Sequence, residues 1–345
     1  MTGVAIALAA CNGARHIDEQ LRSLADQRRL PEELVVVDDA SDDDTAARVE
    51  RFAATAPFAV RLYRNPERLG YRANFMRAAA LCRSEVIAFC DQDDVWEAGK
   101  LAACLPPFDD PRVLLVYHDA LTIGADGQPL APLSQGLAQP MDYALGLTQL
   151  FRRSLLAASP CWDRSLDHKD LRRREKMAHD QWFFFLASVF GSIVHIGEAL
   201  VRYRQHGGNA YGWRAPSRLT ALRWRLWPSL RGRAQQYAAL EAGAAARAAI
   251  LARLAEMLAG DWPERAAAAA LKYRALQELY AQRRRLYGSM SLPDRAGAFR
   301  GLLASRGYRA KEAWGLGPKA LFADFCLGVP AGYRLSAPMP EEDRR

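Results

Sequence analysis

The chain has 345 residues and a mass of 38.3 kDa; half of its residues are hydrophobic and a quarter are charged. This composition predicts one large or two modest folded domains and excludes a disordered chain. No apolar stretch reaches the roughly eighteen residues of a membrane-spanning helix, so we do not expect an integral membrane protein. The net charge of +8 comes from residues 216–345, which carry 22 Lys and Arg against 11 Asp and Glu, whereas residues 1–215 carry 25 against 28.

Apolar and amphipathic segments alternate in the first third of the sequence. Strands are predicted over Val4–Ala10, Glu33–Asp38, Val60–Arg64 and Val86–Cys90. Helices are predicted between them, over Ile17–Gln27, Asp44–Ala54 and Tyr71–Cys82. This alternation is typical of βαβ units and predicts a mostly parallel α/β sheet, in which ligands bind beyond the carboxyl ends of the strands.

The middle of the sequence is rich in Pro, Gly and Asp between residues 106 and 140. It contains a predicted strand near Val113–His118 and a predicted hairpin around Ala125-Asp126-Gly127. Two helices, over Tyr143–Leu156 and Arg173–Phe190, and a strand over Ser192–Tyr203 follow. We place all of these elements in a first domain of residues 1–215.

After Trp213 the sequence becomes rich in Ala, Arg and Leu, and residues 216–345 are predicted to form a basic, α-helical extension. Its main helices are expected over Ala234–Leu258 and Pro263–Tyr287. The second of them places an apolar set on one face, formed by Leu276, Leu279, Tyr280 and Tyr287. The six cysteines form no CxxC pair and mostly lie in apolar stretches, which predicts free thiols and a reducing cytosol.

A first acidic cluster, Asp38-Asp39-Ala40-Ser41-Asp42-Asp43-Asp44-Thr45, directly follows a predicted buried strand. Capping of the next helix explains Ser41, Asp42 and Thr45 well. It explains Asp38 and Asp39 poorly, because carboxylates at the end of a buried strand need a partner.

A second acidic cluster, Asp91-Gln92-Asp93-Asp94, follows the strand over Val86–Cys90. Its carboxylates repel one another unless a cation lies among them. Mg²⁺ and Mn²⁺ take oxygen ligands of this kind, together with substrate phosphates. Because both clusters follow strands of one parallel sheet, we expect them to share a crevice that holds a metal ion and a phosphate-bearing ligand.

An ordered set of motifs resembles the family 2 glycosyltransferases of the GT-A fold, nearest to their bacterial rhamnosyltransferase-like branch. The motifs lie within about residues 3–210 and are Ala9-Ala10-Cys11-Asn12-Gly13, Val37-Asp38-Asp39-Ala40-Ser41-Asp42, Asn65 with Arg68-Leu69-Gly70-Tyr71 and Asn74, Asp91-Gln92-Asp93-Asp94-Val95-Trp96, His179-Asp180-Gln181-Trp182 and Tyr203-Arg204-Gln205-His206. The resemblance implies an inverting transfer of a sugar from a nucleotide diphosphate to a hydroxyl of a cell-surface glycan or lipid-linked saccharide. The donor that it implies is dTDP-rhamnose.

The same resemblance assigns a nucleotide-sugar site. It places Asn12, Asp38 and Asp39 near the base, with Ala9 and Cys11 approaching through their backbone. Further contacts with the nucleotide sugar are expected from Arg68, Asn74, Asp91 and Gln92. The family's usual Thr-Tyr before the Asn is here Ala10-Cys11, so a hydroxyl and a ring that could cover the base are missing.

The resemblance also assigns the chemistry. Asp91, Asp93 and His206 are expected to hold a Mn²⁺ or Mg²⁺ ion that neutralises the diphosphate leaving group, to which Arg204 or His206 could reach. Asp180 corresponds to the catalytic base that deprotonates the acceptor hydroxyl. The acceptor is expected to contact His179 and Trp182. Residue chemistry alone leaves open that Asp180 is only a first-turn carboxylate favoured by the helix dipole.

The basic segment after residue 215 interleaves arginines with tryptophans, namely Arg223, Arg225, Arg231 and Arg233 with Trp224 and Trp227. Such a segment is typical of proteins that lie on an anionic membrane surface. A solvated helical face is the alternative, and no motif of a nucleic-acid-binding protein accompanies the charge. We therefore expect a cytoplasmic protein that is peripheral at the inner face of the cell membrane.

Two other functions remain open at this stage. The segment Val86–Val95 fits the nucleophile loop of haloacid-dehalogenase-like phosphohydrolases, in which Asp91 would be phosphorylated, although that loop normally opens its domain. A non-catalytic glycan- or nucleotide-binding scaffold would keep the fold without the activity. Donor turnover with and without acceptor separates the three functions.

Overall fold

A computed structural model of the chain describes residues 2–135, 137, 141–168, 175–207, 232–309 and 314–332. These residues divide into two compact units. The first unit contains the described residues up to 137, with 142–160 and 177–207; the second contains 141, 161–168, 175–176 and the residues from 232 onward. The predicted boundary near residue 215 lies outside the described residues, as do Arg223, Trp224, Arg225, Trp227 and Arg231.

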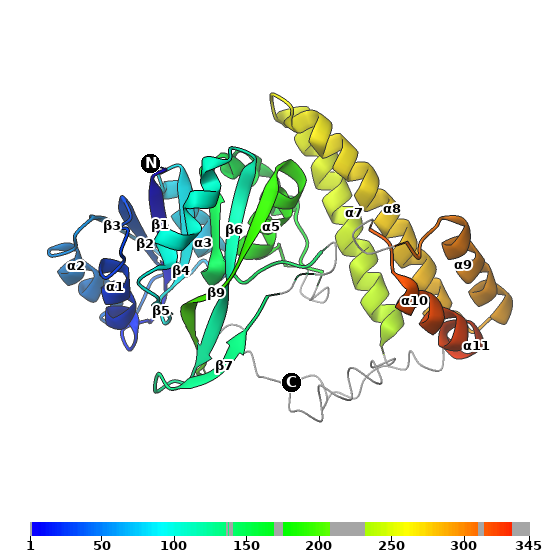
Figure 1. Cartoon of the computed structure of the whole chain (residues 1–345), viewed down its shortest axis with the longest axis horizontal. Helices are drawn as coiled ribbons and strands as arrows, with labels where there is room; N and C mark the ends of the chain where they lie inside the picture. The colour runs from blue at the N-terminus through cyan, green and yellow to red at the C-terminus, as the bar shows by residue number, and fades with distance from the viewer. Residues whose placement is uncertain are drawn as a thin grey trace. The chain divides into compact units, whose positions relative to one another are not determined.

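A nine-stranded sheet forms the centre of the first unit, in the order β3-β2-β1-β4-β8-β6-β9-β5, with β7 paired to β6 (Figure 1). Its parallel part contains β1 (Val4–Ala10), β2 (Glu33–Asp38), β3 (Ala59–Arg64) and β4 (Val86–Asp91). Strands β1, β2 and β4 are buried along nearly their whole length, which is why their sequences are continuous apolar runs. The prediction of these four strands is confirmed.

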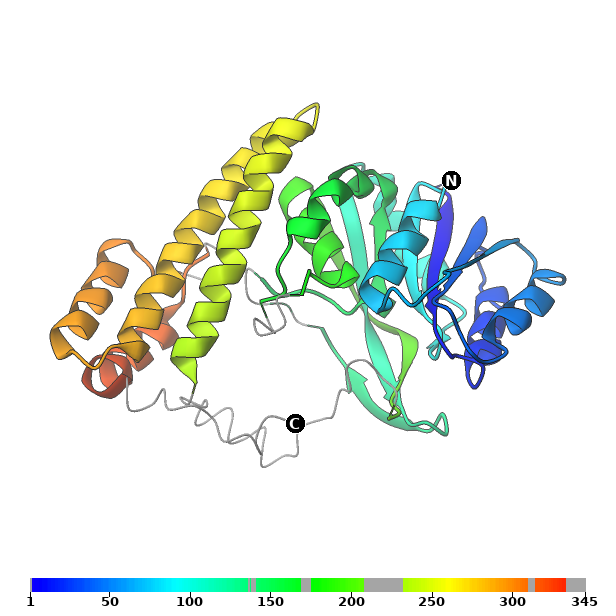
Figure 2. The same ribbon diagram turned by 180° about the vertical axis from the view of Figure 1, so that it is seen from behind.

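Helices cover both faces of the parallel part. The helices α1 (Ile17–Ala25) and α2 (Thr45–Ala53) contact each other on one face, and α3 (Tyr71–Leu81) lies beside α5 (His179–Phe190) on the other (Figures 1 and 2). Helix α5 begins later than predicted, because residues 175–178 are not helical and Ala178 has extended backbone angles. Its first turn therefore starts with His179 and Asp180.

The segment Tyr143–Leu156, which the sequence predicts as a helix, contains a strand instead. A short 3₁₀ turn, η2 (Gly146–Thr148), leads into β8 (Gln149–Arg152), which runs antiparallel to both of its neighbours and is followed by the 3₁₀ helix η3 (Arg153–Arg164). All four residues of β8 are buried. A run of buried residues this short carries no period of its own, so pairing with the neighbouring strands decides its structure.

The other half of the sheet is mixed. The strand β9 (Ser192–Arg204) runs parallel to β6 (Val113–Ile123), and β7 (Pro129–Leu133) returns antiparallel to β6 after the predicted hairpin. The short strand β5 (Val95–Trp96) pairs with the end of β9. This last pairing brings the residues after the second acidic cluster next to the final residues of β9.

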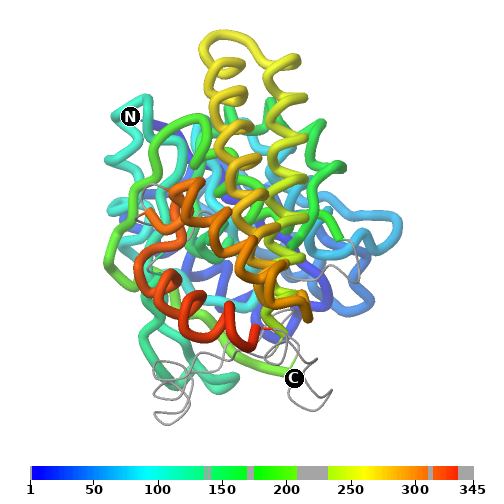
Figure 3. Tube along the Cα trace, turned by 90° about the vertical axis from the view of Figure 1, so that its right-hand side faces the viewer, coloured from blue at the N-terminus to red at the C-terminus, as the bar shows by residue number. Residues whose placement is uncertain are grey.

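The second unit is helical, as predicted. The helices α7 (Arg233–Met257) and α8 (Trp262–Gly288) pack along each other, and α9 (Leu292–Ala304) packs on α8 (Figures 1 and 3). A continuous helical stretch, formed by α10 (Pro318–Ala323), the π-helical segment η5 (Asp324–Gly328) and α11 (Val329–Ala331), lies beside α9. The predicted apolar face of α8 is buried.

A buried carboxylate ties the last helical stretch to α8. Asp324 is fully buried and accepts hydrogen bonds from Arg283 at 2.7 Å, from the Tyr287 hydroxyl at 2.8 Å and from the Tyr308 hydroxyl at 3.0 Å. The charge of Asp324 is therefore paired and its oxygens are satisfied, as a buried carboxylate requires.

In the part of the chain that the structure describes, no helix is both long and apolar enough to cross a bilayer.

Candidate active site

The two acidic clusters lie at one edge of the sheet, where β1, β2 and β4 end. The register of the parallel strands pairs Asp38 with Ala10 and Asp91 with Ala9. The two aspartates therefore flank the end of β1 from opposite sides, on strands that lie about 4.8 Å from it. This edge, with the loops that follow the three strands, is the candidate active site and is called the strand-end site below.

Asp38 joins the loops that follow β1 and β2. It is buried, and its carboxylate accepts a hydrogen bond from the Ser41 hydroxyl and lies 3.6 Å from Nε of Arg64. The Ser41 oxygen in turn accepts the backbone N–H of Asn12 at 2.8 Å, and the Asn12 side chain accepts the N–H of Asp42 at 2.8 Å. Asn12 has a φ of 51°, a left-handed conformation that asparagine tolerates better than most residues.

Asp39 holds the loop that precedes α3. Its Oδ1 accepts the Asn65 side-chain amide at 2.6 Å and the backbone N–H of Leu69 at 2.8 Å, and its Oδ2 accepts the N–H of Gly70 at 2.8 Å. Gly70 has a φ of 81°, which favours glycine at this point of the loop. A carboxylate at the end of a buried strand was expected to need a partner. For Asp39 that partner is the loop before α3, which donates three hydrogen bonds to the charged carboxylate.

Asn74 is a buried bridge between strands, only 1% exposed. Its side-chain amide donates to the carbonyl of Val37 at 2.8 Å and accepts from Asn65 at 3.0 Å. A contact with the nucleotide would need these hydrogen bonds to be exchanged, so the position of Asn74 does not support the predicted contact. Arg68, by contrast, is half exposed at the rim of the site, where it pairs with Asp42.

Gln92 joins the end of β4 to the end of β1. Its side-chain amide accepts the backbone N–H of Cys11 at 2.9 Å and donates to the carbonyl of Cys11 at 2.9 Å. A Cβ on Gly13 would lie 2.1 Å from Oε1 of Gln92, so a side chain at residue 13 would displace the Gln92 amide. The backbone of Cys11, which was expected to approach the base, is thus bound by Gln92.

Residues at the end of β9 form hydrogen bonds with the second acidic cluster. Arg204 is buried, and it donates its backbone N–H to Asp94 at 2.9 Å, its Nε to the carbonyl of Asp93 at 2.8 Å and its Nη2 to Glu19 at 2.7 Å. These bonds commit Arg204 to the loop rather than to a diphosphate. His206 lies at the surface of the cluster, with its Nε2 2.7 Å from Oδ2 of Asp93.

Three residues at this site were not predicted from the sequence. The ring of His16 stacks on the ring of His206 with 5.4 Å between centroids, and Glu19 pairs with Arg204. Lys100, the first residue of α4 (Lys100–Cys104), is fully buried; its ammonium group donates to the carbonyl of Leu147 at 2.7 Å and lies 3.6 Å from the centroid of the Trp96 ring. A lysine directly before an apolar Leu-Ala-Ala run is the one signal that could have identified it.

The second cluster carries negative charge that its surroundings compensate poorly. Burial, and then the charges of Asp93 and Asp180, raise the pKa of Asp91 to about 8, against the opposing effect of Lys100. Burial, and then the charges of Asp93 and Asp91, raise the pKa of Asp94 well above its ordinary value, and one Asp94 oxygen has no hydrogen-bond partner among the described residues. Burial also lowers the pKa of Lys100 to about 8. A cation bound at this site would stabilise it.

Asp180 reaches this cluster from the first turn of α5. Its charge acts on Asp91, although the two residues lie far apart in the sequence. Its carboxylate accepts the backbone N–H of Gln181 at 2.8 Å, and its carbonyl accepts the side chain of Gln149 at 3.2 Å, which ties the start of α5 to β8. The side chain remains partly exposed, as a group that exchanges protons with a substrate must.

The positions of His179 and Trp182 do not support the two predicted acceptor contacts. His179 is buried between aromatic rings, 3.8 Å from the centroid of Phe75 and 4.6 Å from that of Phe89, and burial lowers its pKa to about 3. Trp182 is fully buried on the next turn of α5. The indole N–H of Trp182 and both ring nitrogens of His179 have no hydrogen-bond partner among the described residues. Both side chains therefore belong to the core that holds α5 against the sheet.

The predicted three-residue metal site is not preformed. Within residues 2–135, 137, 141–168, 175–207, 232–309 and 314–332, no three His, Cys, Asp or Glu side chains converge to hold a metal ion. The pair Asp93 and His206 still fits two positions of a coordination sphere, because its oxygen and nitrogen lie 2.7 Å apart. Mg²⁺ in particular is usually bound by one or two carboxylates with substrate phosphates and waters. The residues present therefore fit an ion that takes its remaining ligands from a diphosphate.

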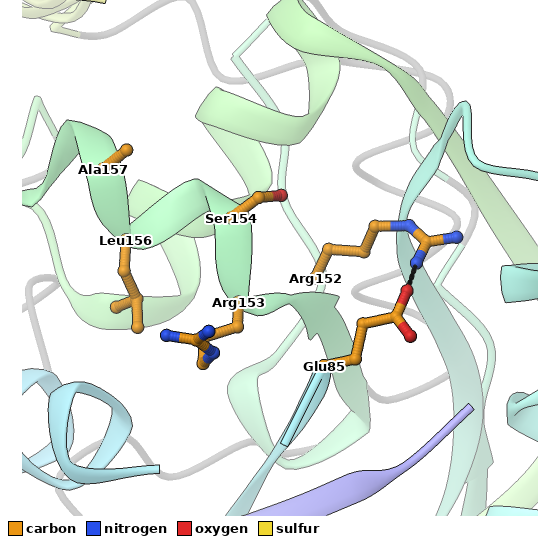
Figure 4. A pocket seen from close by; sticks show the side chains of 6 residues that line it. All are labelled: Glu85, Arg152, Arg153, Ser154, Leu156 and Ala157. Atoms are coloured by element: carbon orange, nitrogen blue, oxygen red, sulfur yellow. Dashed lines mark hydrogen bonds and ion pairs between the residues drawn. The ribbon is translucent and has the colours of Figure 1, made fainter. Parts of the chain in front are cut away.

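A cavity of about 410 Å³ lies away from these residues (Figure 4). Its lining includes Glu85 and Arg152, which point toward one another as an ion pair, and also Arg153, Ser154, Leu156 and Ala157. Glu85 precedes β4 and Asp91 ends it, so this cavity lies at the opposite end of the strand from the acidic cluster. We assign it no part in the chemistry.

Comparison with known proteins finds a family model that matches part of the chain. Residues 5–162 match the model described as Glycosyl transferase family 2. The chain is 28% identical over 201 residues to an uncharacterized protein of Mycobacterium tuberculosis. The aligned region covers 56% of this chain and 56% of that protein, so this chain spans about half the length of that relative. It is also 31% identical over 98 residues to a dTDP-rhamnosyl transferase of Shigella flexneri, covering 27% of this chain and 34% of that protein.

A solved structure supports the fold. The crystal structure of S. aureus TarS is similar to this chain with a TM-score of 0.51 at 16% sequence identity, covering 97% of this chain and 54% of that one. The GT-A fold that the sequence predicts, followed by a helical region, is confirmed.

Proposed function

We propose that this chain, whose residues 5–162 match the model of the family 2 glycosyltransferases, transfers a sugar from a nucleotide diphosphate to a hydroxyl with inversion at the anomeric carbon. The acceptor that we propose is a cell-surface glycan or a lipid-linked saccharide. The observation that carries the proposal is the position of Asp180 in the first turn of α5, where its charge acts on Asp91 at the end of β4.

In this proposal Asp180 is the general base. The acceptor oxygen forms a bond to the anomeric carbon, the bond from that carbon to the diphosphate oxygen breaks, and the acceptor proton passes to a carboxylate oxygen of Asp180. Its place in the first turn of a helix favours the ionised form that such a base requires. The hydrogen bonds from Gln181 and Gln149 position the carboxylate and the backbone that carries it.

We assign Asp93 and His206 as the protein ligands of a Mn²⁺ or Mg²⁺ ion, with Asp91 as a neighbouring carboxyl group whose ionised form a bound cation would favour. When bound, such an ion neutralises the charge that develops on the diphosphate leaving group. The stack of His16 on His206 holds the imidazole in the orientation that brings Nε2 to Asp93.

The loops after β1 and β2 would hold the nucleotide. Asn12, Asp38 and Asp39 shape this part of the strand-end site, and Arg68 lies exposed at its rim, where it could exchange Asp42 for a phosphate. dTDP-rhamnose is the donor that we propose. Two features support it: the motif pattern of the sequence and the partial similarity to the Shigella flexneri dTDP-rhamnosyl transferase.

The cellular setting that we propose is the cytoplasmic face of the cell membrane. A lipid-linked acceptor would be reached there, and the net charge of the chain after residue 215 is strongly positive. The membrane-binding segment predicted from Arg223, Arg225, Arg231 and Arg233 lies outside the described residues except for Arg233. Arg233 is buried and bonds the Tyr287 hydroxyl at 3.0 Å.

The phosphohydrolase alternative is not favoured. Asp91 lies inside the segment that matches the glycosyltransferase family, and its raised pKa opposes a role as an ionised nucleophile at neutral pH. A non-catalytic scaffold is separated from an enzyme by turnover alone.

The test compares Asp180→Asn with Asp109→Asn, a matched change at an exposed residue of the same unit. A panel of nucleotide sugars is screened for binding by calorimetry, and transfer is then followed with the donor that binds. We expect Asp180→Asn to lower the rate constant by a factor of roughly 10²–10⁴ with little change in donor affinity, and Asp109→Asn to change neither. Wild-type turnover by Asp180→Asn would show that the base lies elsewhere.

A further inference from the structure

The second unit exposes an apolar surface formed by two neighbouring helical segments. Helix α9 presents Leu292, Phe299 and Leu303 on one face at helical spacing, and the α10–η5 stretch presents Phe322 and Phe325 beside them. The rings of Phe299 and Phe325 lie 5.9 Å apart and join the two rows. We call these five residues the α9–α10 surface; the two segments lie side by side in Figures 1 and 3.

The large side chains of this surface are held in an exposed position. Phe322 is 72% exposed and Phe325 is 64% exposed, which is unusual for phenylalanine. Between them in sequence, Asp324 points inward and is held by Arg283, Tyr287 and Tyr308. The rotation of the helical stretch is therefore fixed by a buried ionic network, and the two rings point outward as a consequence.

The charged residues around this surface are almost all positive. In the described segments 292–309 and 314–332, the exposed charged residues are four cations and one anion, namely Arg300, Arg306, Arg309 and Lys319 against Asp294. The other two charged residues there, Arg295 and Asp324, are buried and hydrogen-bonded. An exposed apolar surface on segments whose exposed charges are mostly positive is typical of an interaction site rather than of an ordinary solvated face.

We propose that the α9–α10 surface docks on an anionic lipid bilayer. Its phenylalanine and leucine side chains match the apolar face that an interfacial helix buries at the boundary of headgroups and acyl chains, and its cations match anionic headgroups. A second copy is the poorer occupant, because a two-fold contact through this surface would place the four cations of each copy against those of the other. The choice of a bilayer rests on the proposed membrane setting and is independent of the donor and of the catalytic base.

The test uses the full chain and vesicles of two compositions, phosphatidylcholine alone and phosphatidylcholine with phosphatidylglycerol, in a co-sedimentation assay. The double variant Phe322→Ser/Phe325→Ser removes the apolar part of the surface. Its matched control is Leu271→Ser on α8, because Leu271 is 65% exposed. The triple variant Arg300→Gln/Arg306→Gln/Lys319→Gln tests the charge. Thermal unfolding verifies that each variant is folded.

We expect the wild-type chain and Leu271→Ser to bind the anionic vesicles and not the neutral ones. The phenylalanine pair should lower the partition coefficient at least tenfold, since each ring removed from the membrane loses the free energy of its burial. Each removed cation should lower it roughly fivefold, so the triple variant should lose on the order of a hundredfold.

Three results would overturn the proposal. The wild-type chain could fail to bind anionic vesicles, or the variant Phe322→Ser/Phe325→Ser could bind them as well as the wild type does. The third result is a wild-type chain that is dimeric in sedimentation velocity while this double variant is monomeric. Transfer to a water-soluble acceptor without vesicles reports separately on the proposed activity.

Discussion

The carboxylate of Asp180, in the first turn of α5, acts on Asp91 at the end of β4, where burial, then Asp93 and then Asp180 raise the pKa of Asp91. The sheet places the second acidic cluster at a strand end, and Gln149 of β8 bonds the backbone at the start of α5. The two groups that the proposed transfer would use, a base and a site for the leaving group, therefore come from different parts of the chain and meet only in the folded protein.

The raised pKa of Asp91 predicts a loss of stability with rising pH in the metal-free protein. The folded state holds a proton on Asp91 up to about pH 8, whereas the unfolded state loses it near pH 4, so unfolding releases a proton between these values. From pH 6.5 to 7.5 the free energy of unfolding should fall by about 1 kcal/mol from this group. Urea denaturation in chelator should show a shallower decline for Asp91→Asn than for the wild type. Equal slopes would contradict the assigned environment.

On the acid side, His179 should act in the opposite direction. Burial lowers its pKa to about 3, so the unfolded state binds a proton between about pH 6.5 and 3 that the folded state refuses, and stability is lost as the pH falls through this range. His179→Leu, which keeps an apolar side chain of similar volume, should weaken this loss, and His195→Gln on the surface should not. Transfer activity should survive in His179→Leu. A folded but inactive variant would restore His179 to the acceptor site.

Asp39 should matter for the loop before α3 more than an exposed carboxylate of the same cluster does. In Asp39→Asn one backbone N–H, of Leu69 or Gly70, loses its acceptor, which should cost about 2–3 kcal/mol of unfolding free energy. Asp42→Asn breaks only an exposed ion pair with Arg68 and should cost less than about 1 kcal/mol. Chemical denaturation of both variants measures the difference, and similar costs would show that the loop does not depend on Asp39.

Metal binding should depend on the diphosphate, because the described residues bring only two candidate ligands, Asp93 and His206, close together. Electron paramagnetic resonance of Mn²⁺ should show weak binding to the protein alone and tighter binding when the nucleoside diphosphate is added. Asp93→Asn and His206→Gln should each weaken the ternary complex at least tenfold, whereas His195→Gln, which alters a histidine far along β9, should not. Tight Mn²⁺ binding without nucleotide would show that a third protein ligand has been missed.

The sequence predicts the parallel half of the fold well because its strands are buried on both faces. Such strands are continuous apolar runs, and their carboxyl ends are marked by Asp38 and Asp91. The strand β8 could not be predicted, because Gln149–Arg152 becomes a strand only through its neighbours; Arg152, for example, bonds the carbonyl of Val113 at 2.9 Å.

The position of the candidate site could be predicted from the sequence, but the contacts that each of its side chains makes could not. Motif spacing marks Asp39, Asn74 and Gln92 as residues of the site, yet their hydrogen bonds join loops and strand ends. His179 shows the same limit. It stands next to the candidate base in sequence, but helical geometry turns adjacent residues about 100° apart, so one faces the aromatic core and the other the acidic cluster.

The six cysteines give this chain a native position for a chemical probe. Cys326 is the one that is exposed, and it directly follows Phe325, a residue of the α9–α10 surface. Burial raises the pKa of Cys11, Cys82, Cys90, Cys104 and Cys161, which keeps those thiols protonated and slow to react. A maleimide fluorophore should therefore attach at Cys326 in the unmodified protein, and its emission would report the polarity around the two exposed phenylalanines without any engineered residue.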